Sequence, residues 1–252
     1  MQNYFAVLVF FLHLPYQTTL PSALPGKNTT KILFVGNSYT FFNNLPQIVT
    51  IMTENENSKL VTRKSVAGGA SLSDHWRGEK GLKTQELIRD GNFDIVILQE
   101  ASMGPVSEPD TMLKYTRLFC DLIKKKKAKA CLFATWPRKD SPLNQKTIDS
   151  VYTIAASENG AEVAPVGKAW SNAIRQRPGM ELYDTDKSHP SELGTLLAAC
   201  VIVVKILHQL PYKLPLFYYT SDMDKESLLL MHIDEQDAAF CRKVAVETVN
   251  SQ

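Results

Sequence analysis

Short apolar runs recur along the chain, and longer segments with helical spacing separate them. Each run is short enough for a buried strand, and the runs cover Lys31 to Val35, Leu60 to Val66, Phe93 to Leu98, Ala130 to Thr135 and Ala161 to Val166. The helical spacing predicts helices over Leu45 to Asn55, Ser73 to Arg89, Asp110 to Lys126, Leu143 to Glu158 and Ser191 to Leu207. Because parallel strands need crossover connections, this alternation predicts an α/β three-layer sandwich with a five-stranded parallel sheet.

The end of the chain is predicted to continue the same domain. A proline-rich turn region, "LPYKLP", follows Gln209, and apolar residues at helical spacing predict a last helix from Asp237 to about Thr248. The sequence holds no internal repeat and no glycine-rich nucleotide loop of known spacing. We therefore predict a single domain over residues 31–252.

The start of the sequence is typical of an export signal. An apolar stretch runs from Tyr4 to Leu14, too short to span a bilayer, and the small residues Ser22 and Ala23 follow it. The positive charge that normally precedes such a stretch is missing, so a mistaken start codon is the alternative. We predict a signal peptide at residues 1–23, a secreted or periplasmic location, and no stable membrane insertion after its removal.

Composition narrows the classes of partner and cofactor. The chain has 252 residues, 44% of them hydrophobic, and a net charge of +2, which gives no reason to expect a nucleic-acid partner. Its cysteines are widely spaced without a metal-binding pattern, so we predict no metal. Free, buried thiols are favoured for Cys120, Cys131, Cys200 and Cys241, although export would permit a disulfide such as Cys200 with Cys241.

Polar residues follow the predicted strands at the edge of the sheet where ligands of such folds bind. Ser38 follows the first strand, Gly68 and Gly69 follow the second, Gln99 follows the third, and the segment from Asp184 to Pro190 lies beyond the fifth. A nucleophilic serine needs a base, the base needs an orienting acceptor, and the developing oxyanion needs donors. The sequence offers each of these chemical groups.

Asp186 and His189 lie three residues apart before a predicted helix, so Asp186 can orient the imidazole that deprotonates Ser38. Glycine at positions 68 and 69 allows backbone N–H groups to approach a substrate oxygen. These residues predict a catalytic triad of Ser38, His189 and Asp186, with oxyanion donors from Ser38, Gly69 and Gln99.

The order of these motifs resembles that of the SGNH, or GDSL-like, hydrolases. "GNSYTFFNNLP", "AGGASLSDHW", "VILQEAS" and "SHPSELG" are similar to a branch of secreted bacterial members of uncharacterised function. The resemblance implies a flavodoxin-like fold, a serine esterase and no cofactor. One block departs from the family pattern of Gly-x-Asn-Asp, because Gln99-Glu100-Ala101-Ser102 stands in its place. The third oxyanion donor is therefore open between Gln99 and Ser102.

Several further residues are candidates for contacts with the substrate. They are Asn37, Tyr39, Gly68, His75, Trp76, Glu100 and Trp136. His75 is also a rival base, but its place inside a predicted helix favours a surface or substrate-contact role. The two tryptophans either stack on a sugar ring or pack in the core. Glu100 is either a second acid or an ion-pair partner of Arg138, and the pocket wall is expected from Tyr39, Phe41, Phe42, Asn43 and Asn44.

We therefore expect a serine esterase that hydrolyses a carboxylic ester, with an acetyl ester on carbohydrate as the substrate that the resemblance and the export signal imply. The expected partner is a small-molecule or glycan ester. One alternative is an acyltransferase that uses the same residues on an acceptor hydroxyl. The other is a glycan-binding protein without catalytic activity.

Overall fold

A computed structural model describes residues 28–251, so the predicted signal peptide at residues 1–23 lies outside the described part of the chain. The centre is a five-stranded parallel sheet in the order β2-β1-β3-β4-β5. Its strands are β1 (Asn28–Gly36), β2 (Ser58–Val66), β3 (Ile95–Leu98), β4 (Lys129–Phe133) and β5 (Glu162–Ala164). The predicted parallel α/β sheet is confirmed.

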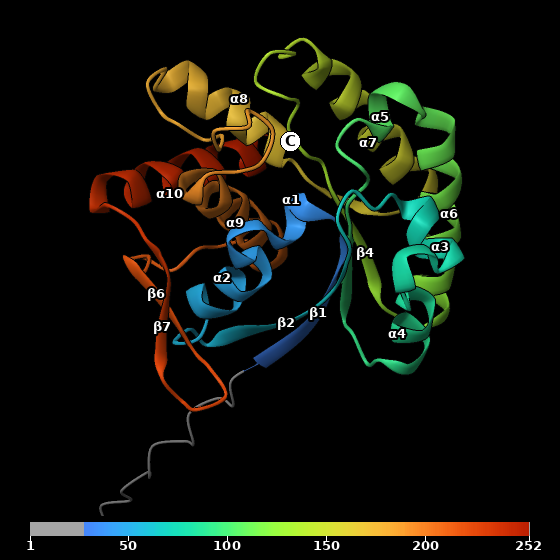
Figure 1. The fold of residues 1–252 in the computed structure, drawn as a ribbon, viewed down its shortest axis with the longest axis horizontal. Helices are drawn as coiled ribbons and strands as arrows, with labels where there is room; N and C mark the ends of the chain where they lie inside the picture. Colours follow the sequence, from blue (N-terminus) through green and yellow to red (C-terminus); the bar gives the residue numbers. More distant parts are fainter. Residues whose placement is uncertain (1–27, 252) are drawn as a thin grey trace, which may run out of the picture.

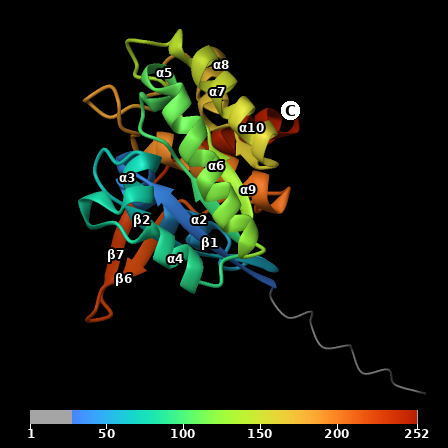
Figure 2. The same ribbon diagram turned by 90° about the vertical axis from the view of Figure 1, so that its right-hand side faces the viewer.

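Helices cover both faces of this sheet (Figures 1 and 2). One layer contains α2 (Leu45–Met52), α8 (Val166–Gln176), α9 (Glu192–Leu207) and α10 (Glu235–Asn250), and the other contains α3 (Leu72–Arg77), α4 (Thr84–Asp90), α6 (Pro109–Lys125) and α7 (Asn144–Asn159). Alternate residues of β1 serve the two cores, because Ile32 and Phe34 pack in one cluster while Leu33 and Val35 pack in the other. The continuous apolar runs of the sequence thus reflect strands buried on both faces.

Helix α9 lies inside the molecule. Every residue from Gly194 to Val204 is buried, and Cys200 belongs to the same core cluster as Cys241 of α10. All four cysteines are free and buried, which agrees with the favoured interpretation over a Cys200–Cys241 disulfide. Burial raises the pKa of the Cys131 thiol to about 12, so this thiol stays protonated at neutral pH.

The structure corrects three expectations about secondary structure. The helix predicted over Ser73 to Arg89 is interrupted between α3 and α4, because Gly78 ends α3 with a φ of +73° and a short 3₁₀ turn, η2 (Glu79–Gly81), follows. Helix α8 is not among the predicted helices, since the predicted strand extends to Val166 whereas β5 ends at Ala164.

The third correction concerns the end of the chain. A hairpin of β6 (Phe217–Ser221) and β7 (Ser227–His232) precedes α10, where the sequence predicts only a turn region. Tyr218 and Met231 face each other across this hairpin and are buried, which attaches the hairpin to the core. Within residues 28–251, no helix is long and apolar enough to cross a membrane.

Candidate active site

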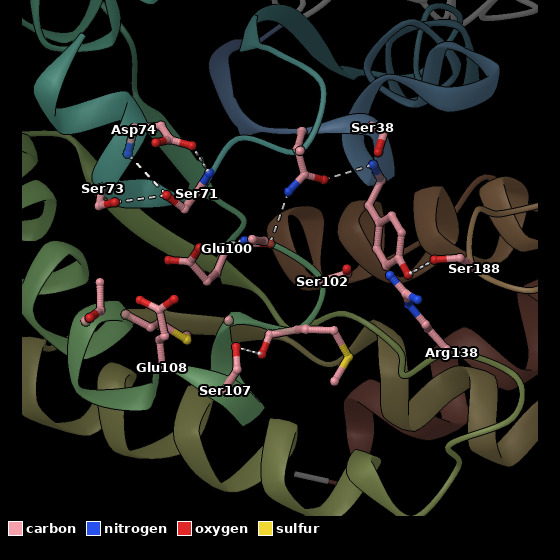
Figure 3. A pocket seen from close by; sticks show the side chains of 18 of the residues that line it. Ser38, Ser71, Ser73, Asp74, Glu100, Ser102, Ser107, Glu108, Arg138 and Ser188 are labelled. Atoms are coloured by element: carbon pink, nitrogen blue, oxygen red, sulfur yellow. Dashed lines mark hydrogen bonds between the residues drawn. The ribbon is translucent and has the colours of Figure 1, made fainter. Parts of the chain in front are cut away.

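A cavity of about 620 Å³ opens at the carboxyl ends of the strands, where the sequence placed the chemistry. Ser38 and Arg138 lie at one end of the cavity, and Asp74 and Glu108 lie at the other (Figure 3). Most of the lining side chains carry hydroxyl or carboxyl groups. They include Ser38, Tyr39, Ser71, Ser73, Asp74, Glu100, Ser102, Ser107, Glu108, Thr111 and Ser188.

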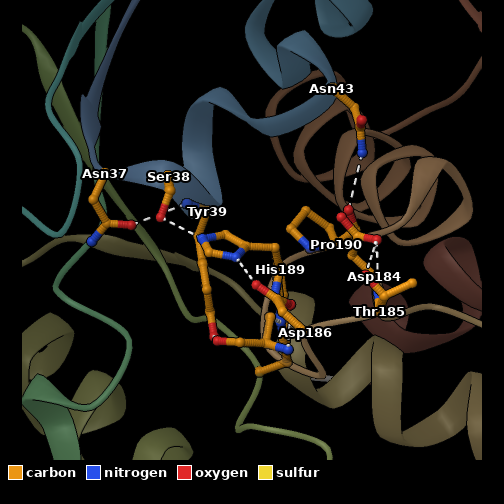
Figure 4. A network of polar contacts seen from close by, with 11 residues as sticks. Asn37, Ser38, Tyr39, Asn43, Asp184, Thr185, Asp186, His189 and Pro190 are labelled. Carbon is orange, nitrogen blue, oxygen red and sulfur yellow. Dashed lines mark hydrogen bonds and ion pairs between the residues drawn. The ribbon is translucent and has the colours of Figure 1, made fainter.

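The three residues of the predicted triad meet at one end of this cavity (Figure 4). Ser38 begins the short helix α1 (Ser38–Phe41), directly after β1, while His189 and Asp186 lie in the loop between α8 and α9. Nε2 of His189 is 2.8 Å from Oγ of Ser38, and Nδ1 of His189 pairs with Oδ2 of Asp186. This is the geometry in which an imidazole can accept a serine proton while a carboxylate fixes its tautomer.

The Asp186 carboxylate is held by several donors. Besides the imidazole, the backbone N–H groups of Ser188 and His189 donate to its Oδ1, each at 2.9 Å. The hydrogen bond from His189 and these backbone donors lower the pKa of Asp186 to about 2. The side chain is therefore ionised at neutral pH, as an orienting acceptor must be.

Asn37 joins the loop of the serine to its neighbours. Its Nδ2 donates to the carbonyl of Ala70 at 2.9 Å, and its Oδ1 accepts from the N–H of Tyr39 at 3.1 Å. Asn37 is 2% exposed, so nearly all of it is buried beneath the site, although it borders the cavity. These hydrogen bonds cap α1 and fix Ser38 against the loop after β2.

Gln99 does not reach the cavity, which corrects its predicted role as an oxyanion donor. The side chain is fully buried, and its Oε1 accepts from the backbone N–H of Asn37 and from Oγ1 of Thr40, each at 2.9 Å. Its Nε2 donates to the carbonyl of Glu100. Gly36 permits this arrangement, because a Cβ there would lie 2.4 Å from Gln99 Oε1. Both ends of the Gln99 amide are thus engaged in holding backbone.

Gly69 borders the cavity, whereas Gly68 does not. Gly69 has a φ of +62° in a turn closed by a 3.1 Å hydrogen bond from the N–H of Ala70 to the carbonyl of Ala67. Within the described residues, the N–H groups of Ser38 and Gly69 have no hydrogen-bond acceptor. Both are therefore available to a bound oxygen atom.

His75 lies in the interior, so neither a surface role nor a substrate contact applies to it. The residue is 0% exposed, and its Nε2 lies 2.9 Å from the carbonyl oxygen of Gly36, to which it must donate. Nδ1 then accepts from the hydroxyl of Thr84 at 2.7 Å. Burial lowers the pKa of His75, which favours this neutral ring. His75 anchors the residue that precedes Asn37.

Neither tryptophan is free to stack on a sugar, because Trp136 is a core residue and the partly buried Trp76 packs against the core, which corrects the sugar-stacking alternative for both. Trp136 is fully buried between Tyr39, whose ring centroid is 4.7 Å away, and Trp170, at 3.9 Å. Its Nε1 donates to the carbonyl of Ser188 at 3.0 Å, so it holds the loop that carries His189. Trp76 packs edge-on against Phe119 instead of bordering the cavity.

Glu100 is a buried carboxyl group at the cavity wall. It is 3% exposed, and its oxygens accept from the N–H of Ala101 at 2.6 Å and from that of Leu72 at 3.3 Å. It forms no ion pair with Arg138 among the described residues, so that alternative is wrong. Desolvation raises the pKa of Glu100 to about 7, and the charges of Asp74 and Glu108 act in the same direction.

Two residues near the triad were not assigned these roles from the sequence. Oγ of Ser188, inside the Asp-x-x-His motif, lies 2.8 Å from the hydroxyl of Tyr39, and burial raises the pKa of Tyr39 so that this hydroxyl stays protonated. The ring of Phe42 stacks on the imidazole of His189. Of the five residues expected in the pocket wall, only Tyr39 borders the cavity. The motif spacing contained no signal for either contact.

Among residues 28–251, no three His, Cys, Asp or Glu side chains are arranged so that they could hold a metal ion.

Comparison with solved structures relates this fold to hydrolases. A protein from Slackia heliotrinireducens, provisionally assigned as an SGNH hydrolase, is 27% identical and has a TM-score of 0.59, with 71% of this chain and 100% of that one covered. A DUF4886 family protein from Bacteroides uniformis is 18% identical with a TM-score of 0.70 and covers 88% of this chain and 95% of its own. An acetyl xylan esterase, AlAXEase, is 15% identical with a TM-score of 0.56 and covers 68% and 97%. No family model and no curated protein matches the chain.

The buried carboxyl group makes stability depend on pH. The pKa of Glu100 rises from 4.5 to about 7 on folding, so the folded state retains a proton that the unfolded state loses. The contribution of protonated Glu100 to the free energy of unfolding is fully present below pH 4.5 and is lost as the pH rises through 7. The Glu100→Gln variant should therefore gain up to about 3 kcal/mol over the wild type by pH 8, and several degrees in melting temperature, with no difference at pH 4.5.

The measurement is thermal unfolding across this pH range, with Glu86→Gln as the control because Glu86 is an exposed carboxylate on α4. The control should follow the wild type. Parallel curves for wild type and Glu100→Gln would show that the Glu100 carboxyl group is not held neutral in the folded protein.

Proposed function

We propose that this chain, which belongs to the SGNH hydrolase superfamily, is a serine esterase whose nucleophile is Ser38. The observation that carries the proposal is the continuous hydrogen-bonded series from Ser38 Oγ through both nitrogens of His189 to Asp186, beside the cavity described above. A serine hydroxyl is a weak nucleophile unless an adjacent base removes its proton, and His189 lies at the required distance.

In the first half of the proposed reaction, Oγ of Ser38 bonds to the ester carbonyl carbon while Nε2 of His189 takes the hydroxyl proton. Asp186 stabilises the resulting imidazolium through Nδ1. Collapse of the tetrahedral intermediate breaks the bond to the leaving oxygen, which receives the proton from His189. The products of this step are a free alcohol and an acyl group on Ser38.

In the second half, water replaces the alcohol. His189 takes a proton from the water as it attacks the acyl carbon, and returns that proton to Oγ when the bond to Ser38 breaks. The carboxylic acid leaves, and the enzyme is restored. An acceptor alcohol in place of water would make the same intermediate an acyltransferase intermediate.

The negative charge on the carbonyl oxygen needs donors. We assign the N–H groups of Ser38 and Gly69, which border the cavity and lack other acceptors in the described part of the chain. Since Gln99 is committed to Asn37 and Thr40, the third donor falls to the hydroxyl of Ser102. Ser102 borders the cavity and contacts the hydroxyl of Tyr39.

The lining of the cavity supports a polar leaving group. Hydroxyl and carboxyl side chains dominate it, and its apolar side chains are Ala101, Met103 and Met112. A long alkyl chain would leave those polar groups without partners, whereas sugar hydroxyls can exchange hydrogen bonds with them. We therefore propose an acetyl ester of a carbohydrate as the substrate class, consistent with the acetyl xylan esterase of the same fold. Export of the enzyme to such a substrate remains a prediction from the sequence.

The Ser38→Ala variant should lose hydrolysis of p-nitrophenyl acetate, by at least about 10³-fold, because no other group can form the acyl intermediate. Its melting temperature should stay within a few degrees of the wild type, since the hydroxyl lies at the surface of the cavity. Ser157→Ala, at an exposed position of α7, serves as the matched control and should keep full activity.

A phosphonate ester probe provides a second measurement, since it should label the wild type at Ser38 and leave Ser38→Ala unlabelled. If the folded wild type neither hydrolyses acetyl esters nor reacts with the probe, the esterase proposal is wrong. Glycan binding by that inert protein would then support the non-catalytic alternative.

Substitutions of Ser102 and Gln99 should affect different properties, kcat in the first case and the unfolding free energy in the second. Ser102→Ala should lower kcat about 10²-fold without a change in melting temperature, as expected for a lost oxyanion donor. Gln99→Ala leaves the buried N–H of Asn37 without a partner, so it should lower the unfolding free energy by about 1–3 kcal/mol. Steady-state kinetics and urea unfolding of both variants test the assignment. Unchanged kcat in Ser102→Ala would remove Ser102 from the oxyanion site.

A further inference from the structure

The imidazole of His189 is enclosed on sides that the triad does not use. The ring of Phe42 lies over one face, with centroids 4.0 Å apart and planes inclined by 10°. Tyr39 meets the imidazole edge-on at 5.7 Å. Because Ser38 and Asp186 engage the two nitrogens, these aromatic contacts leave the ring little freedom to turn. Phe42 itself does not border the cavity, so its contact is with the histidine and not with a bound ester.

The backbone after Phe42 adopts an uncommon conformation. Asn43 and Asn44 are consecutive left-handed residues, with φ values of 47° and 53°. Non-glycine residues seldom adopt this conformation, asparagine more readily than most, and such strain persists where the surroundings hold it. The 3₁₀ turn η1 (Phe42–Asn44) is therefore fixed by contacts outside itself.

Those contacts come from Asn43. Its Nδ2 donates to the carbonyl of Pro190 and to the hydroxyl of Thr195, each at 3.0 Å. Pro190 directly follows His189, and Thr195 is a buried residue of α9. Asn43, which follows Phe42, is thus hydrogen-bonded to Pro190, which follows His189. Asn44 has the same backbone conformation but is exposed and makes no side-chain capping bond.

We propose that Phe42 is a positioning residue for His189, with Asn43 as its tether, a role that rests on the function proposed above. The ring holds the imidazole between Ser38 and Asp186, and its electron-rich face stabilises the imidazolium that forms when Ser38 gives up its proton. An aliphatic side chain of similar size fills the same space but lacks that face. The aromatic ring, and not only its bulk, is the feature that the site uses.

The other charged and titratable groups near the imidazole come from residues that a Phe42 substitution leaves unchanged. Asp186 and Lys187 lie in the same loop, Tyr39 approaches from α1, and Arg138 borders the same cavity from the loop after β4. A change seen in a Phe42 variant alone therefore reports the missing ring.

The first measurement follows the protonation of His189 in the full chain by NMR, with the signal assigned through a His189→Gln variant among the five histidines. In Phe42→Leu, the pH at which half of this imidazole is protonated should fall by about half a unit to one unit, because the charged form loses its aromatic partner. Phe42→Trp should restore the wild-type titration. Phe41→Leu is the matched control, since the Phe41 ring centroid is 6.1 Å from that of Phe42 and, among the described residues, no ring contact joins Phe41 to His189.

The second measurement is the pH profile of ester hydrolysis. Phe42→Leu should lower kcat about two- to tenfold with KM unchanged, and the acid limb of the profile should move with the NMR titration. Phe41→Leu should leave both parameters at wild-type values. An unchanged titration in folded Phe42→Leu would overturn the proposal, as would an altered titration accompanied by wild-type kcat.

The tether is tested by a matched pair of substitutions. Asn43→Gly removes the hydrogen bonds to Pro190 and Thr195 while it tolerates the left-handed backbone, and it should reproduce the effects of Phe42→Leu. Asn44→Gly keeps those bonds and should leave the titration and kcat unchanged. Equal behaviour of the two variants would contradict the tether. The NMR arm requires no turnover, so absence of esterase activity in the wild type would refute the proposed function without deciding the Phe42 contact.

Discussion

The hydrogen bond from the backbone of Asn37 to the side chain of Gln99 determines where the serine lies. Strands β1 and β3 pair in parallel with Val35 opposite Leu98, so the residues that follow emerge side by side. The N–H of Gln99 bonds to the carbonyl of Val35, and its amide oxygen accepts from Asn37 in a space that only glycine at position 36 leaves open. This buried contact at the carboxyl ends of β1 and β3 fixes the turn from which Ser38 projects, and the cavity and the histidine loop are arranged around it.

Around that contact, several buried polar side chains bind backbone groups of neighbouring segments. His75 donates to the carbonyl of Gly36, and Asn37 donates to the carbonyl of Ala70. Glu100 accepts from the N–H of Ala101 and from that of Leu72, the first residue of α3. Each polar group would be costly to bury alone, and each is matched by a main-chain partner. The loops after three strands therefore behave as one rigid surface, which suits a site whose donors must be in place before the substrate binds.

The sequence predicted those features that leave a periodic or spaced signal. The five strands followed from short apolar runs, and the triad geometry followed from Ser38 after a strand with Asp186 and His189 three residues apart. Gln99 was misplaced and Trp136 was left open, because a polar or aromatic residue near a strand end looks the same whether it faces a ligand or supports backbone. His75 was misplaced because its position within a helix does not show which face of that helix is buried. The break at Gly78 was passed over because one glycine within a helical pattern is compatible with either outcome. The position of the Phe42 ring over His189 depends on the left-handed backbone of Asn43 and Asn44, which no periodic pattern in the sequence indicates.

The triad combines one local contact with one distant contact. Asp186 and His189 are neighbours in the same loop, whereas Ser38 and His189 are separated by 151 positions and meet only when α9 has packed beside α2 in their common layer. A chain that has formed its early strands but not this docking holds a serine without a base. On the proposed function, nucleophilic reactivity at Ser38 would therefore arise only with completed tertiary structure, so partly folded chains would not be acylated.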